Sequence, residues 1–228
     1  MPTLTEFLNA AAAKFGANLL PGAVVEISLE RPMDELIRQF EALGPYHRGT
    51  PGKWAHCFVI ANYAPAGSTI LEATIRDQET GEIIWNTTVQ EFIQILSQPT
   101  GSGGIYESAA TDYDDPRVHP LGLKIAQGLT DAQRASIVTA GEGFLNQGYH
   151  YDIPGLFREL IRLTTGIDLP SGPKLLFCSA YVQAVYRAAL GEPAGNFMPS
   201  TTQSTDVTPD DLWYSALGQQ IRPVDVGL

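Results

Sequence analysis

The chain has few of the features that define several large classes of protein. Only two of its 228 residues are cysteines, Cys57 and Cys178, which excludes the disulfide framework of small secreted domains but leaves one bridge between them open. No apolar run approaches the roughly 18 residues of a membrane span. The first residues, MPTLTE, lack the basic start of a signal peptide. The sequence therefore predicts a protein made in the cytoplasm, with neither a membrane span nor a secretory leader.

Positive charge is also scarce. The chain has 14 Lys and Arg against 25 Asp and Glu, a formal net charge of −11, and no two basic residues are adjacent. Nucleic acid is therefore not an expected partner, because phosphate backbones bind clustered positive charge. Hydrophobic residues make up 44% of the chain, enough for a sizeable core. This length and composition predict one domain over residues 1–228.

The order of predicted elements indicates an α+β domain. Residues 3–6 (TLTE) form a capping box, which predicts a helical lead-in over about residues 3–20. A small antiparallel sheet and then further helices follow. Residues 97–115 lose all periodicity and collect Gly, Ser and Asp, so we expect a flexible surface loop there. The predicted strands cover residues 23–29, 54–63, 69–75 and about 82–85; the predicted helices start near residues 32, 88, 130, 154, 178 and 209.

Cys178 lies at the start of one of these helices. Residues 170–173 (PSGP) block a helix upstream and Gly191 ends the apolar run that follows. A thiol at a helix N-terminus has a lowered pKa and is a better nucleophile at neutral pH. Taken alone, a cysteine on an apolar helix is more often a small buried hydrophobe. A histidine and a carboxylate elsewhere favour the nucleophile.

His56 and Glu72 fall on two predicted strands that are neighbours in sequence. A thiol nucleophile needs a base, and the base needs a partner that orients it. The two positions have the same parity, so an antiparallel hairpin with an even pairing sum puts both side chains on one face. Each is flanked by apolar residues, and a buried polar group needs a partner. The alternative is a His–Glu pair that only stabilises the sheet.

Several short motifs carry a family resemblance. Residues 53–60 (KWAHCFVI) and 70–73 (ILEA) resemble the histidine and third-residue strands of NlpC-type papain-like cysteine hydrolases, and residues 177–182 (FCSAYV) resemble their nucleophile helix. Histidine and glutamate precede cysteine here, which resembles the circularly permuted, YiiX-like branch. Residues 148–152 (GYHYD) and 208–212 (TPDDL) agree with it. Ala23 and Ala180 depart from the Gly-Asp and Cys-Ser-Glu patterns of many relatives, which leaves the substrate open.

The resemblance implies a papain-like fold and a Cys-His-Glu triad. Cys178 would attack a carbonyl, His56 would take and return the proton, and Glu72 would orient His56. The implied function is cleavage of an amide bond in a peptide, with bacterial cell-wall stem peptides as the leading substrate. The family includes antibacterial effectors, for which a dedicated secretion system would export the chain and a cognate inhibitor protein would be a partner. The alternatives are an acyl hydrolase or acyltransferase on lipid or other acyl bonds, and a non-catalytic binding module.

Other candidate residues carry weaker signals. Tyr151 could contact substrate or be a second oxyanion donor, although an aromatic packed at a helix entrance is the simpler interpretation. His47, in a loop before the histidine strand, could line a substrate cleft or be solvated. Cys57 should point away from His56 into the core. No cofactor is predicted, because His119 and His150 lack zinc-ligand spacing and the acidic residues of the 97–115 loop are expected to be solvated.

Overall fold

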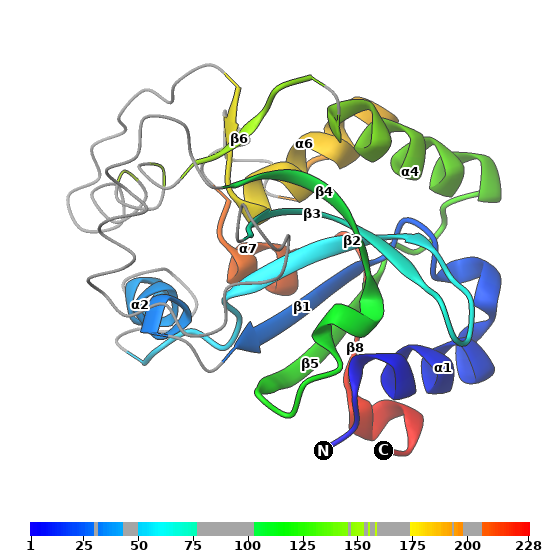
Figure 1. Ribbon diagram of the computed structural model, residues 1–228. Helices are drawn as coiled ribbons and strands as arrows, with labels where there is room; N and C mark the ends of the chain where they lie inside the picture. Colours follow the sequence, from blue (N-terminus) through cyan, green and yellow to red (C-terminus); the bar gives the residue numbers. More distant parts are fainter. Residues whose placement is uncertain are drawn as a thin grey trace.

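The protein is built around one curled, eight-stranded sheet (Figure 1). The computed structural model describes residues 1–29, 32–42, 50–76, 103–145, 147–152, 155, 158, 174–192, 194–197 and 207–228. The strand order is β7-β6-β4-β3-β2-β1-β5-β8, and every pair is antiparallel except β6 with β7. The strands are β1 (Val24–Leu29), β2 (His56–Asn62), β3 (Thr69–Ile75), β4 (Gly103–Ala109), β5 (Val118–Ile125), β6 (His150–Tyr151), β7 (Leu175–Leu176) and β8 (Gln219–Ile221).

Helices cover both faces of the sheet (Figure 1). On one face, α4 (Asp131–Leu145) packs against α6 (Cys178–Leu190), and both contact β2. On the other face lie α1 (Leu4–Phe15) and the short 3-10 helix η2 (Ala110–Tyr113). The described residues also form α2 (Pro32–Glu41), α7 (Pro209–Tyr214), and the 3-10 turns η1 (Ala17–Leu19) and η4 (Pro223–Val226).

Each face of the sheet therefore has its own apolar core. Val59 and Leu71 point towards α4 and α6, whereas Phe58 and Ile60, on the alternate positions of β2, point towards α1 and η2. The central strands β1, β2 and β3 are buried on both faces, as the continuous apolar character of residues 54–61 predicts. Any polar side chain on these strands must find its partners inside the protein.

Predicted helix starts agree with the structure where they rest on local chemistry. Thr3 accepts a hydrogen bond from the Glu6 backbone N–H, and Glu6 accepts one from Thr3, which completes the capping box of α1. Thr208 and Asp211 form the same arrangement at α7, which has a proline in its first turn.

Two sequence predictions are wrong here. The sheet is larger than predicted, with eight strands, and the described part of residues 97–115 is not a flexible loop. Residues 103–109 form β4, which pairs with the whole of β3, and residues 110–113 form η2. Two glycines begin β4, and only three of its seven residues are buried without regular alternation, so its local sequence looks like a loop. Pairing with β3 makes it a strand. The strand predicted near residues 82–85 and the helix over 88–96 lie outside the described residues.

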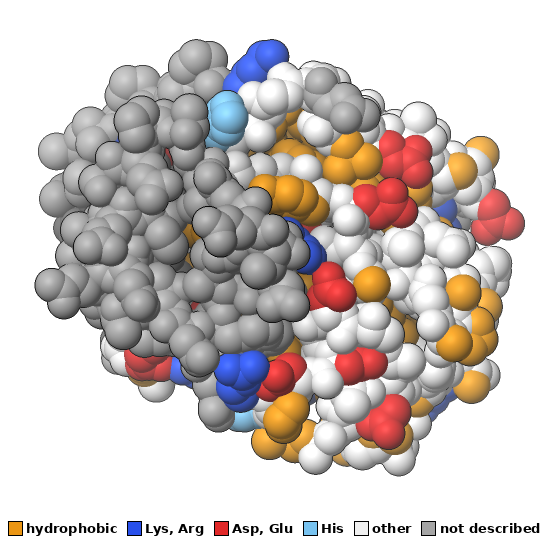
Figure 2. Space-filling model, viewed as in Figure 1, with side chains coloured by type: hydrophobic (Ala, Val, Ile, Leu, Met, Phe, Trp, Pro, Cys, Tyr) orange, Lys and Arg blue, Asp and Glu red, His pale blue; other side chains and the backbone are white. Residues whose placement is uncertain are grey.

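The surface agrees with the composition. On the described part of the face in Figure 2, acidic side chains are scattered singly and no continuous Lys/Arg patch is visible. Within the described ranges, no helix has both the length and the apolar character needed to cross a membrane.

Candidate active site

His56 and Glu72 lie on the same face of neighbouring strands. The β2–β3 register pairs Val59 with Leu71 and Ile60 with Ile70, so the pairing sum is even. Both side chains therefore face η2, and the prediction of a shared face is confirmed. His56 Nε2 lies 3.0 Å from Glu72 Oε2, and both residues are almost completely buried. This is an ordinary distance for an N–H···O hydrogen bond.

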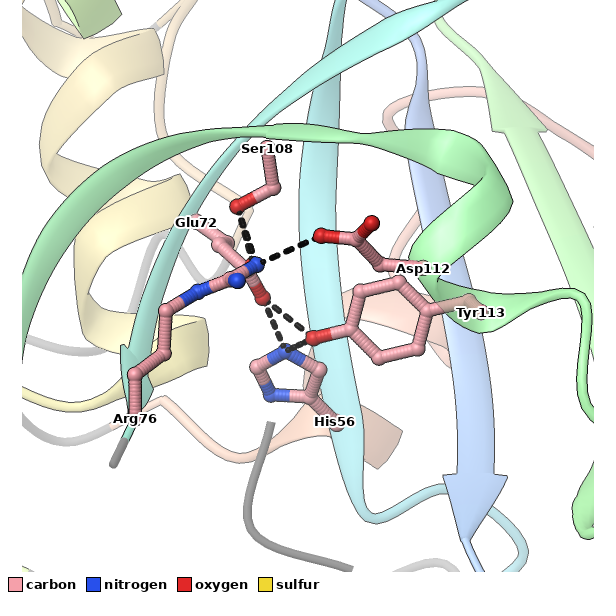
Figure 3. A network of polar contacts seen from close by, with 6 residues as sticks. All are labelled: His56, Glu72, Arg76, Ser108, Asp112 and Tyr113. Carbon is pink, nitrogen blue, oxygen red and sulfur yellow. Dashed lines mark hydrogen bonds and ion pairs between the residues drawn. The ribbon is translucent and has the colours of Figure 1, made fainter. Parts of the chain in front are cut away.

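Four donors surround the Glu72 carboxylate (Figure 3). At Oε1 it accepts hydrogen bonds from Ser108 Oγ at 2.6 Å and from an Arg76 guanidinium nitrogen at 2.9 Å. At Oε2 it accepts from His56 and from the Tyr113 hydroxyl. The same Arg76 nitrogen also contacts Ser108 Oγ at 2.6 Å and Asp112 Oδ2 at 3.1 Å. Both carboxylate oxygens are thus held from two sides, which fixes the plane of the group.

These partners determine the charges of the pair. Burial alone would raise the pKa of Glu72, but hydrogen bonding and the charge of His56, with the hydrogen bonds from Ser108 and Tyr113, lower it to about 2. Burial would lower the pKa of His56, but hydrogen bonds with Cys178 and Glu72 outweigh it and raise the pKa to about 9. Near neutral pH, His56 is therefore an imidazolium beside an ionised Glu72.

Cys178 is the first residue of α6, as the sequence predicts. The N-cap is Phe177, which has extended backbone angles and supplies no side-chain cap to the first backbone N–H groups. A hydrogen bond with Cys57 lowers the pKa of the Cys178 thiol; burial opposes this, and hydrogen bonding and charge from His56 lower it further, to well below its usual range. These shifts favour the thiolate form of Cys178 beside a protonated His56, in a site shielded from water where electrostatic interactions are strong.

The environment of Cys57 is only partly as predicted. Its side chain is buried in the core beneath α4 and α6, on the opposite face of β2 from the Phe58 side chain. It does more than fill the core, because hydrogen bonding from Cys57 is the largest cause of the lowered pKa of the Cys178 thiol. Alternation along β2 places Cys57 under the first turn of α6. Both cysteines are free, so the bridge left open by the sequence is absent.

A second buried carboxyl group lies on the α6 side of the sheet. Glu26 on β1 pairs directly with Cys57 and is fully buried. Neither of its carboxyl oxygens has a hydrogen-bond partner among the described residues. Burial raises the pKa of Glu26 well above its ordinary value; the charge of Lys124 opposes this, and the charges of Asp210 and Cys178 add to it. Burial therefore favours the neutral form of Glu26, which lies opposite Cys57 on the neighbouring strand.

The other predicted candidates are less central. Tyr151 on β6 is buried in the same apolar cluster as Cys178. His150 is exposed on the same strand. His47 lies outside the described residues. The acidic residues of the 110–115 segment, which were expected to be solvated, each have a partner: Asp112 pairs with Arg76, Asp115 with Arg117, and Asp114 with the Thr5 backbone N–H. In the described part of the chain, no group of three or more His, Cys, Asp or Glu residues could hold a metal ion.

Sequence reasoning missed three residues that contact Glu72. Ser108 is on β4, Tyr113 is at the end of η2, and Arg76 follows β3 by one residue. Ser108 and Tyr113 fall within the segment predicted to be a loop, where no periodicity marks them. Arg76 could have been found, because it lies four positions after Glu72 and has the same parity along the strand.

Comparisons with known proteins do not place the chain in a family. No family model matches it, and no curated protein or solved structure is significantly similar to it. The functional argument therefore rests on the site itself and on the motifs in the sequence.

Proposed function

We propose that the protein is a cysteine hydrolase that cleaves an amide bond with a Cys178-His56-Glu72 triad. The observation that carries the proposal is the position of His56 between two groups. Its Nε2 is hydrogen-bonded to a carboxylate that accepts from four donors, and Cys178, the first residue of α6, is close enough to raise the pKa of the ring. A base oriented by a carboxylate and next to a nucleophile is the arrangement that acyl transfer needs.

The proposed reaction has two halves. The Cys178 thiolate attacks the carbonyl carbon, and the resulting oxyanion accepts a hydrogen bond from the Cys178 backbone N–H at the helix start. Collapse of this intermediate breaks the C–N bond, and His56 gives its proton to the departing amine. Water then attacks the thioester while His56 takes a proton from it. Loss of the sulfur restores the thiolate and releases the acid.

The fold class is compatible with a papain-like hydrolase of the permuted NlpC type. Motif order supports this assignment: histidine and glutamate on adjacent strands precede the cysteine at a helix start. Tyr151 lies in the same cluster as Cys178 and is the candidate for a second oxyanion donor. On this resemblance we propose a peptide substrate, with the cell-wall stem peptide first, and a role as an exported antibacterial effector with a cognate inhibitor.

Digestion of purified peptidoglycan tests the substrate. Wild-type protein should release fragments cut at a stem-peptide amide, detected by mass, whereas Cys178→Ala and His56→Ala should release none and still melt cooperatively. No new fragments, together with Cys178-dependent release of fatty acid from a lipid panel, would instead support the acyl hydrolase. No turnover of either substrate, with an unreactive Cys178, would support the binding module.

A further inference from the structure

Tyr113 occupies a position that a triad does not require. The phenol ring is 1% exposed and stacks on Phe58 at 5.0 Å and 29°, and on His56 at 5.9 Å and 29°. Its hydroxyl donates a hydrogen bond to Glu72 Oε2 and also lies 3.2 Å from His56 Nε2 (Figure 3). One hydroxyl thus contacts both the proposed base and the carboxylate that orients it.

The direction of these hydrogen bonds selects one protonation pattern. The phenolic proton is donated to Glu72, so the phenolic oxygen presents lone pairs to His56. An ionised carboxylate can only accept. Both neighbours of Nε2 therefore require a proton on that nitrogen, and Nδ1 is left for the exchange of a proton with Cys178 or, in the thioester, with water.

We propose that Tyr113 is a positioning residue of this site, whose hydroxyl keeps Glu72 ionised and His56 protonated at Nε2, so that Nδ1 serves the nucleophile. The inference rests on the proposed function, because it assigns Tyr113 a role in the activation of Cys178. The stacking on Phe58 holds the hydroxyl in place, and Ser108 and Arg76 hold the other carboxylate oxygen. Glu72 then cannot rotate away from His56.

The pH dependence of Cys178 reactivity separates this role from packing. An ionised Glu72 stabilises the imidazolium, which in turn stabilises the thiolate. Without the Tyr113 hydroxyl, Glu72 should accept a proton at higher pH, and the acidic limb of Cys178 alkylation should move upwards. Several charged and titratable groups surround Glu72 and act on its charge or on that of His56. They are His56 on β2, Arg76 after β3, Tyr106 on β4, Asp112 and Tyr113 on η2, and Cys178 and Tyr181 on α6.

The experiment uses the full chain and iodoacetamide, with alkylation of Cys178 and Cys57 quantified separately from peptide masses between pH 3 and pH 10. Tyr113→Phe removes the hydroxyl and keeps the ring. A hydrogen bond to a charged group is worth about a tenfold change in an equilibrium, so the acidic limb should rise by about one pH unit. The matched control is Tyr186→Phe, which removes another buried hydroxyl, hydrogen-bonded to the Gly22 carbonyl, and should leave the limb unchanged.

Each result has one meaning. A Tyr113→Phe limb that coincides with the wild-type limb, with or without a lower melting temperature, would make Tyr113 a packing residue and overturn the inference. If this variant does not fold, Tyr113→3-fluorotyrosine, which is a stronger donor of similar shape, must move the limb to lower pH, and a limb that does not move overturns the inference equally. A wild-type Cys178 that reacts like an ordinary thiol, with its midpoint near pH 8.5, contradicts the proposed function itself.

Discussion

Glu72 and Glu26 are two fully buried carboxyl groups on the strands that flank β2, and the protein treats them in opposite ways. Glu72 faces η2 and accepts hydrogen bonds from four groups, which lower its pKa to about 2. Glu26 faces α6 and has no hydrogen-bond partner among the described residues, and burial raises its pKa. Burial favours the neutral form of a carboxyl group unless donors compensate for lost water. Partners, not depth, therefore decide which carboxyl is charged.

Lys124 lies near Glu26, but its hydrogen bonds go to other groups and do not keep Glu26 ionised in the way that the donors around Glu72 do. The Lys124 ammonium donates hydrogen bonds to the carbonyl oxygens of Leu212, Trp213 and Ser215 at 2.5–2.8 Å. Its donors thus stabilise the C-terminal end of α7. Burial lowers the pKa of Lys124 to about 8, although the charge of Glu26 opposes this. The charge of Lys124 lowers the pKa of Glu26, but Lys124 donates no hydrogen bond to it.

The largest expected effect comes from removing the charge of Glu72, the carboxylate that accepts four hydrogen bonds. Glu72→Gln replaces one acceptor oxygen by an NH₂ group at a position where four donors converge. This NH₂ group then faces another donor, unless His56 loses its proton at Nε2 and adopts the wrong tautomer for catalysis. We expect the turnover of a peptide substrate to fall by about 10⁴-fold, the cost of the equivalent change in a serine triad. Glu26→Gln is the matched control, and its turnover should stay within a few-fold of wild type. Equal losses in the two variants would contradict the comparison.

Acid stability should distinguish the same two residues. The folded pKa of Glu72 lies below its unfolded value of 4.5, so its contribution to stability is complete above pH 4.5 and is lost as the pH falls towards about 2. That difference in pKa corresponds to on the order of 3 kcal/mol. Denaturant unfolding at pH 3 and pH 6 should show a little more than half of this loss in wild type and a smaller loss in Glu72→Gln. A variant with the same pH dependence as wild type would show that Glu72 is not ionised in the fold.

Replacing Glu26, the carboxyl group without hydrogen-bond partners among the described residues, should stabilise the protein rather than destabilise it. The folded pKa of Glu26 is raised, so the folded state loses stability relative to the unfolded state as the pH rises above 4.5. Glu26→Gln cannot ionise and should raise the free energy of unfolding at pH 8 by about 1–2 kcal/mol, with little change at pH 4. Thermal melts at the two pH values provide the measurement. Destabilisation at pH 8 would mean that Glu26 has partners that compensate for its burial.

The smallest expected effect concerns Cys57, which lies between Glu26 and the nucleophile. Cys57→Ala removes the thiol that hydrogen-bonds to Cys178 but keeps the backbone N–H that does so as well. The pKa of Cys178 should therefore rise by about half to one pH unit, and turnover at pH 7–8 should be largely retained. The midpoint of Cys178 alkylation measures this shift. An unchanged midpoint would show that the Cys57 thiol does not contribute to the ionisation of Cys178.

Local sequence was sufficient for several parts of this structure. The capping boxes of α1 and α7 depend on residues three positions apart, and the strand over residues 69–75 depends on its own apolar pattern. The equal parity of His56 and Glu72 could be read from the sequence, but their shared face also needed an even pairing register, which the β2–β3 pairing has only beyond a shift between Ile60 and Asn62. The start of α6 at Cys178 follows from the residues that block a helix before it. Each of these features is set by interactions within a few residues or across one hairpin.

The environment that gives those residues their charges was decided by the tertiary structure. Tyr113 and Ser108 reach Glu72 from 41 and 36 positions away, and they do so because β4 pairs with β3 over its full length. Cys57 meets Cys178 because α6 packs across β2. Glu26 and Glu72 are the same residue type on buried strands, and no local pattern separates them. Hydrogen-bond donors reach a buried carboxylate through long-range pairing, so the sequence could identify the residues while only the fold determined their protonation.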